Sequence, residues 1–169
     1  MLTLVRLSEK YRTHLNDMMD EWTKTNEEIV PYSIRRIDYR DFDRYLQGFE
    51  EEQMGLPGFV PATTFFGFDT ERDIFVGAVN IRHRLNEALL LNGGHIGDGV
   101  RPSERRKGYA VRMIALALEE CRKLKLSRVL MVCDKQNIGS AKSIVKNGGV
   151  LENEIEVEGK IEQRYWISL

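Results

Sequence analysis

The feature that most constrains the fold is the stretch "VRPSERRKGYAVRM", residues 100–113, because it joins two segments of different character. Before it lies the glycine-rich "GGHIGDGV" (93–100), and after it apolar residues recur every three or four positions. This change of period predicts a strand, a turn and then an amphipathic helix that begins near Ala110. The turn itself contains three consecutive cations (105–107) followed by Gly108.

A strand that leads through a basic, glycine-bearing turn into a helix is an arrangement that binds phosphate. The amides of a first helical turn have no intrahelical partner, and the helix dipole adds positive charge there. Gly108 lets the backbone approach a bulky anion, because no Cβ stands in the way. The chain contains no Gly-x-x-x-x-Gly-Lys-Ser/Thr, and no Gly-x-Gly-x-x-Gly opens a helix after an early strand, so two familiar nucleotide folds are excluded. A solvated basic turn is the plainer alternative to a phosphate site.

Composition excludes several other classes of protein. A formal net charge of −1 gives no basic excess that would indicate nucleic acid or a membrane surface, and a mean hydropathy of −0.38 is ordinary for a globular chain. The N-terminal segment lacks the apolar core of a signal peptide, and no apolar run approaches the ~20 residues of a membrane span. We therefore expect a cytoplasmic protein without nucleic-acid or membrane partners. Cys121 and Cys133 fit no metal-ligand spacing, so we expect no metal.

The remaining segments alternate between helical and strand periods. We predict strands at 2–7, 63–69, 73–83, 95–101 and 127–134, helices at 8–26, 38–53, 110–124 and 137–147, and a closing antiparallel hairpin within 149–169. This order predicts one α+β domain over residues 1–169, in which a mixed, mostly antiparallel central sheet is flanked by helices.

The core "RRKGYA" (105–110) fits the pattern Gln/Arg-x-x-Gly-x-Gly/Ala and stands between a predicted strand and a predicted helix. A further strand and then Asn137, at the start of another helix, follow it. In this context the sequence resembles the acetyl-CoA-binding half of the GNAT superfamily of N-acetyltransferases, and the order of elements along the whole chain is similar too. The resemblance implies a GNAT fold and acetyl-CoA as the cosubstrate.

The resemblance also implies roles for individual residues. Amides of the turn would hold the pyrophosphate, and the end of the preceding strand would pair with the pantetheine arm. A bulge in that strand would splay it from the next one and open a slot for the thioester. Asn137 would hydrogen-bond the pantetheine side, although it also fits a plain helix N-cap. The implied cofactor-binding residues are Gly99, Val100, Arg101, Arg105, Arg106, Lys107, Gly108, Tyr109, Ala110, Asn137 and Ser140.

The activity implied is transfer of an acetyl group to a primary amine, which attacks the thioester directly in a ternary complex. An alkylammonium, with a pKa of ~10.4, must first lose a proton. His95 and Asp98 are the ionisable residues on the strand from which the family draws a base, and each could instead be structural. Ile144 stands where the family often has a proton-donating tyrosine. A non-catalytic acyl-CoA-binding sensor or interaction module is therefore the alternative.

The sequence does not name the acceptor, which we expect to be a small-molecule or peptide amine. Arg82 and Arg84 lie on one face near the predicted pocket and could bind an acidic group, although a solvated face is the plainer reading. Glu27 and Glu28 could instead attract a cationic amine, again with solvation as the alternative. Members of the family are often dimers, so a homodimer is a further expectation.

Overall fold

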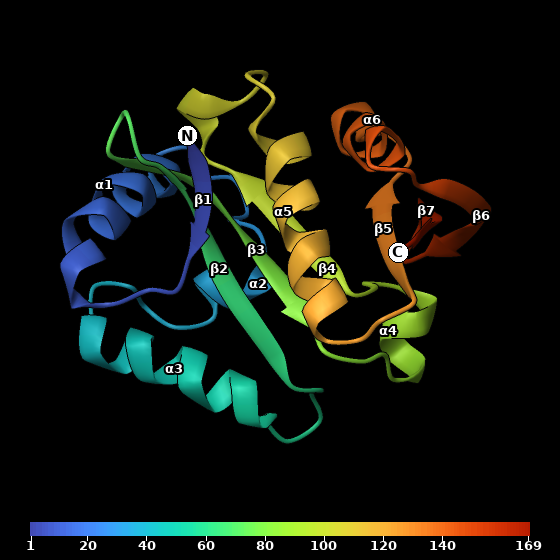
Figure 1. The fold of residues 1–169 in the computed structure, drawn as a ribbon, viewed down its shortest axis with the longest axis horizontal. Coiled ribbons are helices and arrows are strands. Elements are labelled where there is room, and N and C mark those ends of the chain that lie inside the picture. The colour runs from blue at the N-terminus through green and yellow to red at the C-terminus, as the bar shows by residue number, and fades with distance from the viewer.

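The computed structural model describes all 169 residues, which form two antiparallel sheets with flanking helices (Figure 1). The larger sheet has the strand order β1-β2-β3-β4, and the smaller one the order β5-β7-β6. All pairs of neighbouring strands within them are antiparallel. The strands are β1 (Leu2–Val5), β2 (Ala62–Asp69), β3 (Ile74–Arg82), β4 (Ile96–Val100), β5 (Arg128–Asp134), β6 (Val150–Val157) and β7 (Lys160–Ser168).

Helices and short 3-10 turns connect the strands. The helices are α1 (Arg12–Thr23), α2 (Tyr32–Arg35), α3 (Phe42–Met54), α4 (Glu87–Leu91), α5 (Tyr109–Lys123) and α6 (Ile138–Lys146), and the 3-10 turns are η1 (Glu9–Tyr11) and η2 (Pro102–Glu104). None of the helices combines the length and the apolar character needed to cross a membrane.

The four-stranded sheet is covered on both faces. Side chains alternate along β3, so successive residues pack against different helices. Ala78 belongs to an apolar cluster with residues of α1 and α3. Val79 and Ile81 belong to a second cluster, which contains the apolar stripe of α5. Figure 1 shows α5 in front of β3 and β4, close to the boundary between the two sheets. The periodic apolar residues after Gly108 therefore fold as the sequence predicts, against the face of the sheet next to the turn.

The two sheets meet only at the beginning of β4. Gly94 forms an isolated bridge with Met131 of β5. The His95 N–H donates to the Leu130 carbonyl oxygen at 2.8 Å, and the Leu130 N–H donates to His95 Nδ1 at 2.9 Å. Beyond this point β4 pairs only with β3, and β5 only with β7. A slot therefore separates the free edge of β4 from β5.

The predicted α+β class with helix-flanked antiparallel strands is confirmed, with three differences. The expected bulge in the strand 95–101 is wrong: β4 pairs with β3 in one continuous register from Ile96 to Val100, and the slot opens because the chain leaves the second sheet after His95. The central sheet is divided into two. The short helices α2 and α4 were not predicted; α4 is capped by the Asn86 side chain, which accepts from Leu89 N–H at 2.9 Å.

Candidate acyl-transfer site

The turn before α5 has the backbone conformation of an anion-binding loop. Arg106 has φ +61° and Gly108 has φ +84°, both in the left-handed region. A Cβ added at Gly108 would meet no atom within 4 Å. The space outside Gly108 is therefore open, and glycine is favoured there by its backbone angle rather than by crowding.

Six successive amides of the turn and the first helical turn have no acceptor in the protein. The first intrahelical bond of α5 runs from Arg112 N–H to the Gly108 carbonyl at 3.3 Å, and no side chain caps the helix. The N–H groups of residues 109–111 are thus unpaired, as are those of 106–108. Consecutive amides in such a conformation form a concave donor surface for an anion, reinforced by the helix dipole.

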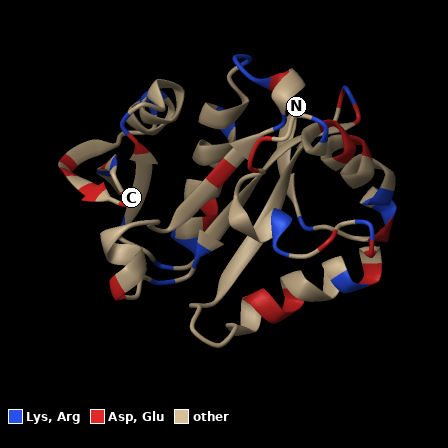
Figure 2. Cartoon of the chain, turned by 180° about the vertical axis from the view of Figure 1, so that it is seen from behind, with Lys and Arg blue, Asp and Glu red and all other residues tan.

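Of the three cations of the turn, only Arg106 is free. The Arg105 guanidinium pairs with Glu27 and donates from Nε to the Val100 carbonyl at 3.1 Å. Lys107 Nζ lies 3.1 Å from Glu104 Oε2, whereas the exposed Arg106 makes no ion pair. Figure 2 shows this turn as a blue stretch, while basic and acidic segments are interspersed elsewhere on the visible face. The amides, with Arg106, are therefore the free donors of the turn.

Buried carboxylates fix the turn to the β2–β3 hairpin. Arg72 Nη2 donates to Glu104 Oε1 at 2.9 Å, and this bond, together with Lys107, lowers the pKa of the Glu104 carboxyl to about 2. The Tyr109 hydroxyl donates to Asp69 Oδ2 at 2.7 Å. Both ends of the turn are thereby held, and its open amides are preorganised.

The strand residues predicted to bind the cofactor differ in the direction that their backbone N–H and C=O groups face. Arg101 N–H donates to the Val76 carbonyl at 2.8 Å, so the backbone groups of Arg101 and Gly99 face β3, and those of Val100 and Asp98 face the slot. The buried Arg101 side chain pairs with Asp17 and Glu21 of α1. A Cβ at Gly99 would lie 2.0 Å from the Val30 carbonyl oxygen. Gly99 thus allows the chain after α1 to cross β4 closely.

Asp98 lies at the slot with an unpaired carboxylate. Its side chain is partly buried and makes no hydrogen bond, and burial raises its pKa to about 6. Across the slot is Cys133 of β5; burial first, and then nearby carboxylates that include Asp98, raise the pKa of its thiol to about 11. A carboxylate with a raised pKa and no partner can accept a proton near neutral pH.

His95 has a different environment. It is buried, its Nδ1 accepts from the Leu130 N–H, and burial with the nearby charges of Arg82 and Arg128 lowers its pKa to about 4. The ring is therefore neutral at pH 7 and completes the joint between the sheets. Both candidate bases lie at the slot, but only Asp98 has a free acceptor: the His95 Nδ1 lone pair is used by the Leu130 N–H, so the neutral ring carries its proton on Nε2.

The residues after β5 that were predicted to be functional also have structural roles. Asn137 caps α6, and its Oδ1 accepts from Ser140 N–H at 3.1 Å, as the N-cap alternative predicts. Ile144 is fully buried in the core. Burial raises the pKa of Cys121 to about 12, as it does for the Cys133 thiol, so neither cysteine is a ready nucleophile.

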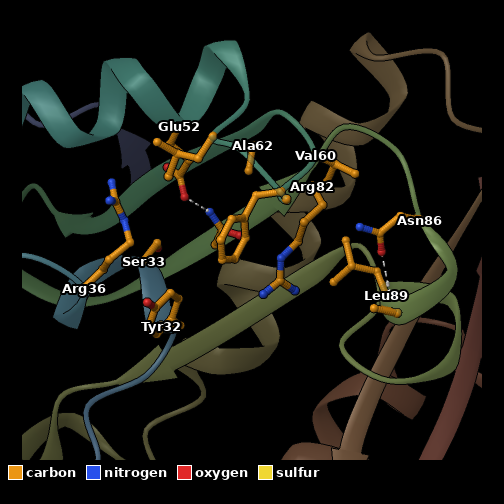
Figure 3. A pocket seen from close by; sticks show the side chains of 14 residues that line it. Tyr32, Ser33, Arg36, Glu52, Val60, Ala62, Arg82, Asn86 and Leu89 are labelled. Carbon is orange, nitrogen blue, oxygen red and sulfur yellow. Dashed lines mark hydrogen bonds between the residues drawn. The ribbon is translucent and has the colours of Figure 1, made fainter.

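A cavity of about 190 Å³ on the other face of the sheet was missed by sequence reasoning, apart from one of its residues (Figure 3). It is lined by Arg36, Glu52, Asn80 and Arg82 among others. The sequence predicts that Arg82 and Arg84 share one face near the pocket. Arg82 lines the cavity, whereas Arg84 is exposed and lies outside it. Glu52 ends a run of three glutamates, and nothing in that run distinguishes the buried member from the solvated ones.

The family profile described as the acetyltransferase (GNAT) domain matches residues 2–150. The chain belongs to the GNAT acetyltransferase family. The match spans the turn, both edges of the slot and α6, and it confirms the family that the resemblance implied. No sequence among curated proteins matches significantly.

Solved structures similar to this GNAT protein include enzymes with different acceptors. A ribosomal-protein α-N-acetyltransferase in complex with coenzyme A has a TM-score of 0.71 at 14% identity, over 99% of this chain and 94% of that one. The microcin C7 self-immunity acetyltransferase, in complex with acetyl-CoA and AMP, has a TM-score of 0.69 at 16% identity, over 99% and 92%. Mutant forms of a spermidine/spermine N-acetyltransferase from Vibrio cholerae reach 0.65 at 16%, over 99% and 95%. At these identities the likeness establishes the fold.

Proposed function

We propose that this GNAT acetyltransferase moves the acetyl group of acetyl-CoA to a primary amine by direct attack in a ternary complex. The observation that carries the proposal is the run of six unpaired amides over residues 106–111, at the end of a strand whose other edge is open. An oriented row of donors at a helix N-terminus suits a pyrophosphate. The coenzyme A and acetyl-CoA complexes of two similar structures support the same ligand.

The residues present fit acetyl-CoA, which when bound would supply the activated acetyl thioester. The amides 106–111 and the Arg106 guanidinium would hold the pyrophosphate, because the space outside Gly108 is open. The backbone groups of Asp98 and the Val100 N–H would pair with the pantetheine arm, because they face the slot, whereas the Val100 carbonyl already accepts from Arg105 Nε. Asn137 caps α6 and Ser140 lies in its first turn, and these two residues complete the predicted cofactor set.

Within this site, Asp98 is the group that receives the proton of the acceptor amine. Its pKa of about 6 leaves it ionised at pH 7 while keeping it more basic than an exposed aspartate. A backbone N–H on the free edge of β4 would stabilise the oxyanion of the tetrahedral intermediate. Ile144 donates no proton, so the departing thiolate takes its proton from water or leaves unprotonated. Neither cysteine enters the reaction, since burial keeps both thiols protonated.

Thermal unfolding with and without acetyl-CoA tests the cofactor assignment. At ~100 times its dissociation constant the ligand adds about 2.7 kcal/mol to the stability of the folded state. We expect this shift in the parent and its loss in Gly108→Asp, which adds bulk and negative charge at the amides. Gly159→Asp is the matched control, because Gly159 also has a left-handed φ of +80° and open space around its Cβ position. An equal ligand shift in Gly108→Asp and the parent would contradict the phosphate assignment.

Release of free thiol in the presence of amines separates an enzyme from a sensor. We expect acceptor-dependent thiol release that falls strongly in Asp98→Asn. Acetyl-CoA binding without turnover toward any amine would favour the non-catalytic sensor.

A further inference from the structure

The cavity missed by sequence reasoning borders β4 from the side opposite α5. Ala62 of β2 and Arg82 of β3 line it together with Glu52 of α3 (Figure 3), and Asn80 of β3 donates to Glu52 Oε1. A Cβ added at Gly97 of β4 would lie 3.3 Å from Arg82 Nη2. The Arg82 guanidinium therefore lies directly over β4 at Gly97, whereas the side chain of the next residue, Asp98, leaves the strand on the α5 face with that of Val79. A molecule in this cavity would reach the strand that carries the proposed base.

The charged groups of the cavity are not paired with one another. Among the lining residues two arginines, Arg36 and Arg82, stand against one glutamate, Glu52, so the formal net charge of the lining is +1. The Glu52 carboxylate accepts from Asn80 Nδ2 at 2.7 Å and from Thr64 Oγ1 at 2.9 Å, without an ion pair. Its position is thus set by neutral donors, and its charge does not cancel that of either arginine by direct contact.

Arg82 makes no direct ion pair, and the nearby charge of Glu52 only partly offsets its burial. Its Nη1 donates only to carbonyl oxygens, those of Gly93 at 3.2 Å and Gly94 at 3.4 Å. Burial lowers the pKa of Arg82, which means that its charged form is disfavoured by the surroundings. A charge removed from water is costly unless an opposite charge and further hydrogen bonds compensate for it. The remaining donors of a guanidinium form a fork that matches a carboxylate.

We propose that the acceptor is a small amine that also carries a carboxylate, such as an amino acid, and that Arg82 binds the carboxylate. This inference rests on the proposed acetyl transfer. A carboxylate on Arg82 would lie over Gly97, and an amine a few bonds away would then lie beside the edge of β4. Arg36, at the end of α2, adds a second positive charge on the same side of the cavity.

Charge and size distinguish this acceptor from other amines. A polyamine carries only positive charge, and a cavity with net charge +1 disfavours it. The volume of about 190 Å³ is below the roughly 300–1,000 Å³ of pockets for drug-sized ligands, so the cavity suits a compact molecule. The arrangement thus differs from what a spermidine acceptor would require, although spermidine is the named substrate of a similar fold.

The test compares matched acceptors with and without the carboxylate. Thiol release is measured with acetyl-CoA and a panel of free amino acids, their carboxamides and spermidine. A carboxamide keeps the amine and the side chain and removes the negative charge; because it also lowers the pKa of the amine, kcat/KM is compared for the unprotonated fraction of each acceptor. We expect kcat/KM to be at least about tenfold higher for the best amino acid than for its carboxamide, the size of effect typical of a hydrogen bond to a charged group.

Arg82→Met should abolish this preference by raising KM for the amino acid far more than KM for its carboxamide. Arg84→Met is the control, because Arg84 is exposed two residues further on and should leave the preference intact. Arg82 also binds two loop carbonyls, so Arg82→Lys provides a second variant that keeps the charge and loses the fork; its preference should be intermediate. Acetyl-CoA binding to each variant, read from the unfolding midpoint, reports folding independently.

Each outcome separates the two proposals. If acetyl-CoA does not bind the parent, the proposed function itself fails. If it binds but spermidine or the carboxamides are preferred, or no carboxylate-bearing amine turns over, only the acceptor class is overturned. An unchanged preference in a folded Arg82→Met variant would overturn the role of Arg82.

Discussion

The two faces of β3 and β4 hold the two halves of the proposed reaction, and they are built in different ways. On the α5 side, one continuous stretch of backbone, residues 106–111, presents the donors. On the α3 side, side chains from α2, α3 and β3 meet in the cavity, with Arg36, Glu52 and Arg82 distant in sequence. A site made of backbone depends on local conformation, whereas a site made of side chains depends on tertiary packing. The backbone site can therefore keep its shape when side chains are substituted, whereas a substitution in the cavity changes the ligand that it binds.

The largest effect that sharpens this comparison is expected at Asp98, where the halves meet. Asp98→Asn should lower kcat by about 10²–10⁴-fold, the usual contribution of a general base. In the parent, kcat/KM should rise with pH through an apparent pKa near about 6, and this limb should disappear in the variant.

The same change should stabilise the fold at neutral pH. The folded-state pKa of Asp98 is raised above its unfolded value of 3.8, so the stability of the protonated form is lost as pH rises through about 6. Asn avoids this loss, and the midpoint of Asp98→Asn at pH 7 should exceed that of the parent. A variant that loses both activity and stability would indicate a structural aspartate instead.

Ile144→Ala should separate packing from chemistry on the cofactor side. The fully buried side chain belongs to the core, so we expect a loss of about 2–5 kcal/mol of unfolding free energy. No proton passes through this position, and kcat should change little at a temperature where the variant is folded. Denaturant unfolding and steady-state kinetics on the same preparation measure both. A severe drop in kcat at retained stability would place the residue in the reaction.

Glu104→Gln tests whether the turn must be held in place for its backbone amides to bind acetyl-CoA. Loss of the charged hydrogen bonds to Arg72 and Lys107 should cost about 2 kcal/mol and weaken acetyl-CoA binding, with the acceptor KM unchanged. Because the folded-state pKa is lowered to about 2, this stability is present above the unfolded value of 4.5 and is lost as pH falls toward about 2. Unfolding midpoints of parent and variant should therefore converge at the acid end.

Glu52→Gln should have the smallest effect, and in the opposite direction. Burial raises the pKa of Glu52, so its ionised form destabilises the fold at neutral pH. Gln retains an acceptor for Asn80 and can donate to Thr64, whose hydroxyl then accepts. A slightly higher midpoint at pH 7, with the difference vanishing below pH 4.5, is the expected outcome. A lower midpoint at pH 7 would show that the carboxylate charge is needed.

The contrast between a local backbone site and a site assembled by tertiary packing also decides how much can be predicted from the sequence. The β2–β3 hairpin, the turn and α5 can be predicted because period, cations and Gly108 lie within one stretch. The slot was expected for a wrong reason: its origin is the His95 ring, which accepts from Leu130 N–H in place of a backbone carbonyl, and no sequence pattern signals that substitution. Nor does the local sequence show that the Arg105 guanidinium pairs with Glu27, a residue far away in the chain.

The narrow joint at His95 has a mechanical consequence. Because β4 and β5 share hydrogen bonds only around Gly94 and His95, the smaller sheet is otherwise joined to the larger one mainly through side chains: Met131, Tyr165 and Ile144 pack in the same apolar cluster as the stripe of α5. The width of the slot is thus set by side-chain packing rather than by backbone hydrogen bonds.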